Sequence, residues 1–201
     1  MNLSNYFWYF TNVIPHRICD DIISYAKYKK EFLGRTGRAD NTKELTKKEL
    51  SDLKKIRNSN VVWMNDAWIY KEIHPFVNFA NRKAGWNFDW DYSEDCQFTI
   101  YRKNQYYDWH QDADNKPYKN GKIRKLSVTV SLSDPKEYKG GELEFDFKNR
   151  RPGRDRVFTC SEILPKGSLV VFPSFVWHRV KPVFEGERFS LVIWSCGNPL
   201  R

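Results

Sequence analysis

The segment YYDWHQDAD, residues 106–114, places His110 among Asp108, Asp112 and Asp114 in a chain of 201 residues that has four histidines in all. In an extended chain, side chains two residues apart point to the same side. His110 and Asp112 could therefore reach one metal ion. A single His-x-Asp match is a weak indication, because short motifs recur by chance, so a metal site here needs a further ligand from elsewhere in the chain.

A calcium-binding loop is the first alternative, since Asp112, Asp114 and Asn115 begin like the loop of an EF-hand. That loop needs a glycine at its sixth position and a bidentate glutamate at its twelfth. Counted from Asp112, these positions hold Pro117 and Ile123. The sequence therefore argues against an EF-hand.

His178 is the strongest further ligand, because it follows an apolar run and a short proline-containing loop and could lie on a neighbouring strand. Two histidines and one carboxylate form the facial triad of non-haem Fe(II) oxygenases, which leaves coordination positions open. Zinc is more often enclosed by four ligands or used with a bound water. His16 and His74 each stand beside a proline without a partner at ligand spacing, so we expect neither to bind a metal.

Arg188 and Ser190 belong to a run of otherwise apolar or aromatic residues, RFSLVIW, that begins ten residues after His178. A buried guanidinium is unfavourable unless an anion pairs with it. A small dicarboxylate would suit this position, because the guanidinium binds a carboxylate through two hydrogen bonds and the Ser190 hydroxyl can add another. An ion pair with an acidic side chain of the protein is the alternative.

Taken in order, these residues resemble the Fe(II)/2-oxoglutarate-dependent dioxygenases, specifically their prolyl-4-hydroxylase-like branch. The resemblance covers residues 97–197, and more loosely the amino-terminal half, where FTNVIPHRICDDII and Arg57-Asn58-Ser59 are similar to the first helix and an Arg-x-Ser segment of that branch. The set that carries it is Tyr101, His110-Gln111-Asp112, GGEL at 140–143, KGSLVVFPS at 166–174, His178, Arg188 and Ser190.

The resemblance implies a role for each of these side chains. Dioxygen would be the second cosubstrate, and ascorbate is a candidate accessory reductant. Tyr107 and Trp109 would flank the site, either shaping a substrate pocket or packing as ordinary aromatic residues. Fe(II) would be bound by three catalytic residues, His110, Asp112 and His178, and 2-oxoglutarate by Arg188, Ser190 and Tyr101.

The activity implied is hydroxylation of a peptidyl residue, with proline as the leading choice, coupled to decarboxylation of 2-oxoglutarate to succinate. The partner would be a protein or a proline-containing peptide. Many collagen-type prolyl hydroxylases use lysine at the position of Arg188. Nucleic-acid demethylases of the superfamily carry a second arginine where this chain has Trp194, which lowers the expectation of a nucleic-acid substrate.

Two other classes of function stay open. A formal net charge of +9 favours a polyanionic partner, although the basic residues are spread along the chain. A dioxygenase of nucleic acid or of a small molecule is therefore one alternative, and a non-catalytic metal-binding interaction module is the other. The basic stretch KNRRPGRDR, residues 148–156, could attract an acidic substrate or form a solvated turn.

The fold that the resemblance implies is mainly β with flanking helices, namely a double-stranded β-helix (jelly-roll) core. We expect one dioxygenase domain over 1–201, with an amino-terminal strand and helices at 1–90 and the core at 91–201. Pro75 should kink or break the helical pattern of 66–84. The runs that predict antiparallel strands are CQFTIY, KLSVTVSLS, GELEFDF, SLVVFP and RFSLVIW.

The polar segment 34–60 predicts a loop followed by a short exposed helix, since Thr46 and Glu49 have the spacing of a capping box. The loop could be an active-site lid or a surface excursion. Four widely spaced cysteines suit reduced thiols, and the sequence holds neither a signal-like start nor a long apolar span. These features predict a soluble cytoplasmic protein without a membrane partner.

Overall fold

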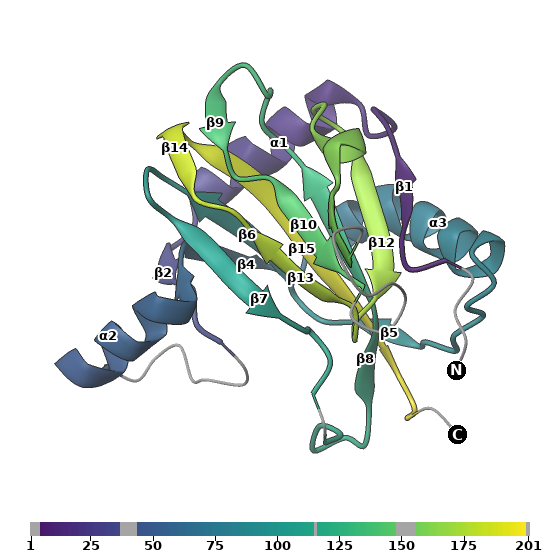
Figure 1. The fold of residues 1–201 in the computed structure, drawn as a ribbon. Helices are drawn as coiled ribbons and strands as arrows, with labels where there is room; N and C mark the ends of the chain where they lie inside the picture. Colours follow the sequence, from purple (N-terminus) through teal and green to yellow (C-terminus); the bar gives the residue numbers. More distant parts are fainter. Residues whose placement is uncertain (1–4, 37–43, 115, 148–155, 200–201) are drawn as a thin grey trace.

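The computed structural model describes residues 5–36, 44–114, 116–147 and 156–199 (Figure 1). Parts of the 34–60 loop and almost all of the basic stretch 148–156 lie outside these ranges. The larger of two antiparallel sheets has eight strands. In spatial order they are β1 (Trp8–Phe10), β12 (Leu169–Pro173), β8 (Ile123–Ser131), β15 (Arg188–Gly197), β6 (Cys96–Tyr101), β4 (Asn60–Met64) and β2 (Phe32–Leu33), with β5 (Tyr92–Ser93) paired to β15.

The smaller sheet packs against the inner face of the larger one, and it carries the histidines. Its strands, in spatial order, are β11 (Val157–Thr159), β10 (Leu143–Asp146), β13 (Trp177–Val180), β7 (Tyr106–His110) and β3 (Arg57–Asn58). Phe145 of this sheet and Phe172 of the larger sheet belong to one buried cluster. A separate pair, β9 (Tyr138–Gly140) with β14 (Val183–Gly186), and a short 3-10 helix, η2 (Ser161–Ile163), complete the strand region.

Helices α1 (His16–Lys27) and α3 (Ala67–Lys83) cover the outer face of the larger sheet. Side-chain alternation along the strands explains this arrangement. In β8, Leu126, Val128 and Val130 pack in the cluster beneath the helices, whereas the alternate positions are Ser127, Thr129 and Ser131, all buried. Apolar side chains therefore hold the helices, and hydroxyl groups line the inside of the barrel.

The helix does not break at Pro75, which was one of the two predicted outcomes, because α3 continues through the proline to Lys83. A proline ring removes one backbone hydrogen bond, to the carbonyl four residues earlier. Both Pro75 and Lys71, the residue with that carbonyl, are exposed, so water can replace the missing donor. Burial of Ile73 and Val77 on the other side holds the helix together.

The third helix, α2 (Lys47–Ile56), begins at the predicted capping box. The Thr46 hydroxyl accepts a hydrogen bond from the Glu49 backbone N–H, and the Glu49 carboxylate accepts one from the Thr46 backbone N–H. None of the residues of α2 is buried, and the helix projects from the barrel edge (Figure 1). The predicted fold class is confirmed: two antiparallel sheets form a double-stranded β-helix with flanking helices.

Candidate active site

The segment that contains His110 and Asp112 differs from the extended chain expected from the sequence. Strand β7 ends at His110, and Asp112 lies in the bend that follows. The backbone N–H groups of Asp112 and Ala113 both donate to the Ser174 carbonyl, at 2.9 Å. Ser174 lies in the short connection that leads to His178. This double hydrogen bond, rather than strand alternation, positions Asp112.

His178 lies on β13 directly across from His110 on β7. The Nε2 atom of His110 is 3.7 Å from Asp112 Oδ1, and the Nε2 atom of His178 is 3.5 Å from Asp112 Oδ2. One ligand atom from each residue lies within 4.8 Å of the others. The structure thus brings the three predicted metal ligands together.

The donor set of these three side chains fits a metal ion. The Nδ1 atoms of His110 and His178 lie 2.7 Å and 3.0 Å from the backbone carbonyls of Asp108 and Val176. A carbonyl can only accept, so each Nδ1 must carry the proton, and each Nε2 keeps its lone pair for a ligand. Asp112 Oδ2 is buried without a hydrogen-bond partner among the described residues.

The pKa shifts favour the metal-binding protonation states. Burial lowers the pKa of His110 to about 3, and the charge of His178 acts in the same direction. Burial would raise the pKa of Asp112, but the charges of His178, His110 and Arg124 outweigh it and lower that pKa to about 2. At neutral pH the imidazole of His110 is therefore neutral and the carboxylate ionised, as metal coordination requires.

Arg188, Ser190 and Tyr101 also come together, inside the barrel. The guanidinium of Arg188 donates from Nη1 to Ser190 Oγ at 3.3 Å, and its Cζ lies 5.6 Å from the centre of the Tyr101 ring. Arg188 is 3% exposed. Within the described part of the chain, no carboxylate lies within 4 Å of its guanidinium. The alternative of an ion pair with a protein acid is therefore not what the described residues form.

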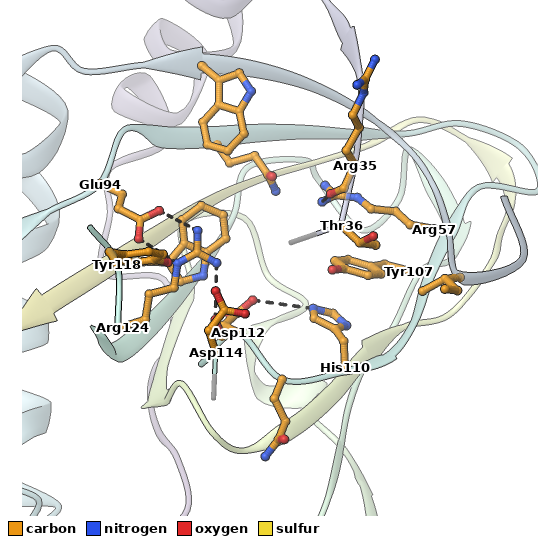
Figure 2. A pocket seen from close by; sticks show the side chains of 15 residues that line it. Arg35, Thr36, Arg57, Glu94, Tyr107, His110, Asp112, Asp114, Tyr118 and Arg124 are labelled. Atoms are coloured by element: carbon orange, nitrogen blue, oxygen red, sulfur yellow. Dashed lines mark hydrogen bonds and ion pairs between the residues drawn. The ribbon is translucent and has the colours of Figure 1, made fainter. Parts of the chain in front are cut away.

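A pocket of about 440 Å³ opens beside His110 and Asp112 (Figure 2). Arg188, Ser190, Tyr101 and His178 are not among its lining residues. The lining side chains are Arg35, Thr36, Ile56, Arg57, Trp63, Glu94, Gln97, Tyr107, His110, Gln111, Asp112, Asp114, Tyr118, Arg124 and Trp194. The pocket is thus rich in arginines and aromatic residues.

The sequence analysis missed the Arg124–Glu94 pair in this pocket. Arg124 donates from Nε and Nη2 to the two carboxylate oxygens of Glu94, at 2.9 Å and 2.6 Å. Its Cζ lies 3.8 Å from the centre of the Trp194 ring. Trp194 occupies the position at which nucleic-acid demethylases have a second arginine. Its ring thus packs against Arg124, an arginine of another strand.

The four flanking residues of the 106–114 segment divide into two groups. Tyr107 stacks on His110 with ring centroids 3.5 Å apart, and Asp114 lines the pocket. Trp109 instead packs under Arg179, whose Cζ is 4.6 Å from the centre of its ring. The Asp108 side chain is 51% exposed and 4.0 Å from Arg179. Tyr107 and Asp114 therefore belong to the site, and Asp108 and Trp109 do not.

The family profile of the 2OG-Fe(II) oxygenase superfamily matches residues 96–196, which is half of the chain and includes all the residues just described except those of the amino-terminal half. The chain belongs to this superfamily. The predicted superfamily is therefore confirmed.

Curated relatives of this 2OG-Fe(II) oxygenase are named PKHD-type hydroxylases. One from Hyphomonas neptunium is 46% identical over 70 residues, which cover 34% of this chain and 27% of that protein. YbiX from Escherichia coli O157:H7 is 40% identical over 99 residues, covering 48% and 40%. The chain thus matches less than half the length of these relatives.

Solved structures agree with the fold over almost the whole chain. A viral collagen prolyl hydroxylase from Paramecium bursaria Chlorella virus-1 superposes with a TM-score of 0.67 at 22% identity, covering 96% of this chain and 97% of that one. A Pseudomonas putida prolyl-4-hydroxylase gives 0.66 at 18%, covering 96% and 93%. Among the described residues of this oxygenase, no helix is both long and apolar enough to span a bilayer.

Gly141 leads to a first prediction for this 2OG-Fe(II) oxygenase. Its φ is +71°, and a Cβ atom added there would lie 2.8 Å from Arg188 Cδ and 2.9 Å from Val183 Cγ2. We expect Gly141→Ala to lower the free energy of unfolding by about 2 to 4 kcal/mol, since it adds an overpacking cost to the cost of a positive φ. Urea denaturation monitored by tryptophan fluorescence measures this change.

Gly121→Ala is the matched control for Gly141→Ala. Gly121 has a φ of +77°, but an added Cβ would meet no atom within 4 Å. Its substitution should cost only about 1 kcal/mol, from backbone strain. Equal losses in the two variants would contradict a packing role for Gly141 against Arg188.

Proposed function

We propose that the chain is an Fe(II)- and 2-oxoglutarate-dependent hydroxylase of a peptidyl residue, with proline as the leading choice. Fe(II) binds to His110, Asp112 and His178, and the reaction converts 2-oxoglutarate to succinate. The observation that supports this most directly is the convergence of two Nε2 lone pairs on a carboxylate with an unpartnered buried oxygen, in a chain of this superfamily.

Arg188 holds the distal carboxylate of 2-oxoglutarate in this proposal. The guanidinium is buried in a hydroxyl-lined interior and has Ser190 as its hydrogen-bond partner, so a carboxylate supplies the anion that it needs. Burial raises the pKa of Tyr101, which keeps its hydroxyl protonated as a donor to the same carboxylate. When bound, the iron would activate dioxygen, which is the oxidant: one oxygen atom goes to succinate as 2-oxoglutarate loses carbon dioxide, and the other is inserted into a C–H bond of the substrate.

The substrate binds in the open pocket, whose lining includes His110 but not Arg188. Tyr107 holds the His110 ring by stacking, and Arg124 contributes a cation that the Glu94 carboxylate balances. The aromatic lining from Trp63, Trp194 and Tyr107 can exclude water from a substrate side chain. Cosubstrate and substrate thus contact different side chains around one proposed metal site.

Proteins of similar structure favour a peptide substrate. A prolyl hydroxylase from Trichoplax adhaerens, with a TM-score of 0.67 at 17% identity over 96% of this chain and 84% of that one, was solved in complex with a hypoxia inducible factor oxygen degradation domain peptide fragment. The pocket of this chain has a volume of about 440 Å³, which is enough for a substrate side chain.

The proposal is tested by succinate formation from purified protein with Fe(II), ascorbate and 2-oxoglutarate. Proline-containing peptides should accelerate turnover, and the stimulating peptide should gain the mass of one oxygen atom. Peptides with alanine in place of proline are the matched control. Stimulation by a methylated oligonucleotide or a free amino acid, with none by any peptide, would show that the substrate class is wrong.

A further inference from the structure

Arg57 is a buried cation in the wall of the pocket. It lies on β3, immediately after α2, and is 4% exposed. Its Nε donates to Ser59 Oγ and its Nη1 to the backbone carbonyl of Arg35, both at 2.8 Å. Nη2 is buried and has no hydrogen-bond partner among the described residues. Across the ranges that the structure describes, no carboxylate oxygen lies within 4 Å of the guanidinium.

Arg124 lies on the opposite side of the same pocket and, in contrast to Arg57, is paired with a carboxylate. Glu94 binds it through two hydrogen bonds, and the facing positions of the two arginines are visible in Figure 2. A buried charge is stable only when a counter-charge or several hydrogen bonds compensate its desolvation. Arg57 makes only two hydrogen bonds, both to neutral oxygens, so its site has room for an anion.

Two further hydrogen-bond donors of the pocket lack partners. The indole Nε1 atoms of Trp63 and Trp194 are buried, and no acceptor from the described ranges bonds to them. Their rings lie 6.2 Å apart, centroid to centroid, and both residues line the pocket. An indole N–H can only donate. With Arg57 Nη2, residues that line the pocket therefore carry three buried donors that no acceptor of the described chain satisfies.

Tyr107 fixes the distance of this donor group from the metal site. The Cζ atom of Arg57 lies 4.5 Å from the centre of the Tyr107 ring, and the Tyr107 and His110 ring centroids are 3.5 Å apart. In Figure 2, Tyr107 lies between Arg57 and His110. One aromatic ring therefore separates the guanidinium from a metal ligand, and an anion on Arg57 would be close to a reacting carbon.

We propose that Arg57 binds a carboxylate of the substrate, carried by the hydroxylated residue or by a residue directly beside it. The substrate is then an acidic peptide segment, which the two indole N–H groups help to hold. This inference rests on the proposed function, which assigns the pocket to the substrate. It assigns Arg57 to the substrate and Arg188 to the cosubstrate, so the two arginines recognise carboxylates of different molecules.

The test measures binding, so that it does not depend on turnover. The protein is loaded with Zn(II), which does no redox chemistry, and saturated with 2-oxoglutarate. Calorimetry then compares two pools of capped pentapeptides in which the three central positions are randomised. Both pools contain proline, alanine and glycine at these positions. The acidic pool also contains Asp and Glu, and the neutral pool contains Asn and Gln instead. We expect the acidic pool to bind at least about tenfold more tightly.

Variants of Arg57 identify the group responsible for this preference. Arg57→Gln should reduce the preference for the acidic pool to about onefold, and Arg57→Lys should retain part of it, because the charge survives without the fork. Lys48→Gln is the matched control: it removes one positive charge from the exposed helix α2, outside the pocket lining, and should keep the full preference. Thermal unfolding of each variant verifies that it is folded.

The outcomes distinguish this inference from its alternatives. Equal binding of the two pools to the unchanged protein would overturn it, whether or not Arg57→Gln folds. A tenfold weaker affinity for 2-oxoglutarate in Arg57→Gln, without a preference between the pools, would assign Arg57 to the cosubstrate instead. A preference lost equally in Lys48→Gln would show general charge attraction. Tight binding of the acidic pool without oxygen insertion by the iron enzyme would refute the proposed function and leave the inference standing.

Discussion

Asp112→Ala is expected to lower kcat/KM by at least about 1000-fold and to weaken Fe(II) binding by more than about 100-fold, since losing even a group that only supports a metal ligand costs 10 to 100-fold. The carboxylate is the only anion of the proposed triad. Without it, the Nε2 atoms of His110 and His178 lose the charged group that lies within 3.7 Å of both. Succinate formation measures the first effect and a competitive metal titration the second.

Asp108→Asn is the matched control for Asp112→Ala. It changes a carboxylate of the same segment whose side chain points to solvent and Arg179. The contact of its backbone carbonyl with His110 Nδ1 is unaffected. We expect turnover within about twofold of the unchanged protein, as for most surface substitutions. Full activity of Asp112→Ala would mean that the proposed ligand set is wrong.

Arg188→Ala should have the second largest effect, a rise of about 100-fold in the KM for 2-oxoglutarate. Removing one partner of a buried charge pair leaves the other unpaired and costs about 2 to 5 kcal/mol. A tenfold change in affinity corresponds to about 1.4 kcal/mol. Among the described residues, no hydrogen bond or ion pair joins Arg188 to the proposed metal ligands, so Fe(II) affinity should be unchanged. Turnover measured against 2-oxoglutarate concentration gives the KM.

Arg188→Lys separates the charge of Arg188 from its shape. Lysine keeps the cation but offers no planar fork, so we expect an intermediate KM, raised by about tenfold. If Arg188→Ala instead lost Fe(II) binding and left the KM for 2-oxoglutarate unchanged, the assignment of the cosubstrate carboxylate to Arg188 would be wrong.

The ligand types and the strand pattern could be predicted because each depends on local sequence. The run KLSVTVSLS alternates apolar and hydroxyl residues, and the structure orients them as alternation requires, with Leu126, Val128 and Val130 under the helices. The sequence also predicted that His178 could lie on a strand next to the one that carries His110. Their role as iron ligands stays a prediction, and so do the cosubstrate roles of Arg188, Ser190 and Tyr101.

Arg124 shows why the substrate side of the pocket could not be predicted. Strict alternation would place it on the same face as Leu126, beneath the helices. The pairing of β15 with β8 instead shifts between Ser195–Leu126 and Cys196–Arg124, so that Lys125 is an extra residue at an irregularity. Such a bulge redirects the side chain beside it. Its presence depends on the partner strand, which the local sequence does not reveal.

The position of Asp112 depends on the tertiary structure in a similar way. The backbone leaves the strand after His110, and two hydrogen bonds to the Ser174 carbonyl of a distant segment hold Asp112 near the histidines. Sequence spacing gave the right pair of residues for a geometric reason that the chain does not use. Pro75 is the converse case, in which exposure of one carbonyl, invisible in the sequence, makes a helix breaker tolerable.

The same hydrogen bonds to Ser174 connect the metal site to the order in which the protein folds. The Ser174 N–H donates to the Lys125 carbonyl, so the Asp112 bend is complete only after β8 and the end of β12 have found each other. A chain with the barrel half assembled has no intact site, so a metal ion held by the three proposed ligands would bind the native state alone. By mass action, an ion at 100 times its Kd would then add about 2.7 kcal/mol to the free energy of unfolding, so the proposed iron site would couple the stability of the fold to iron supply.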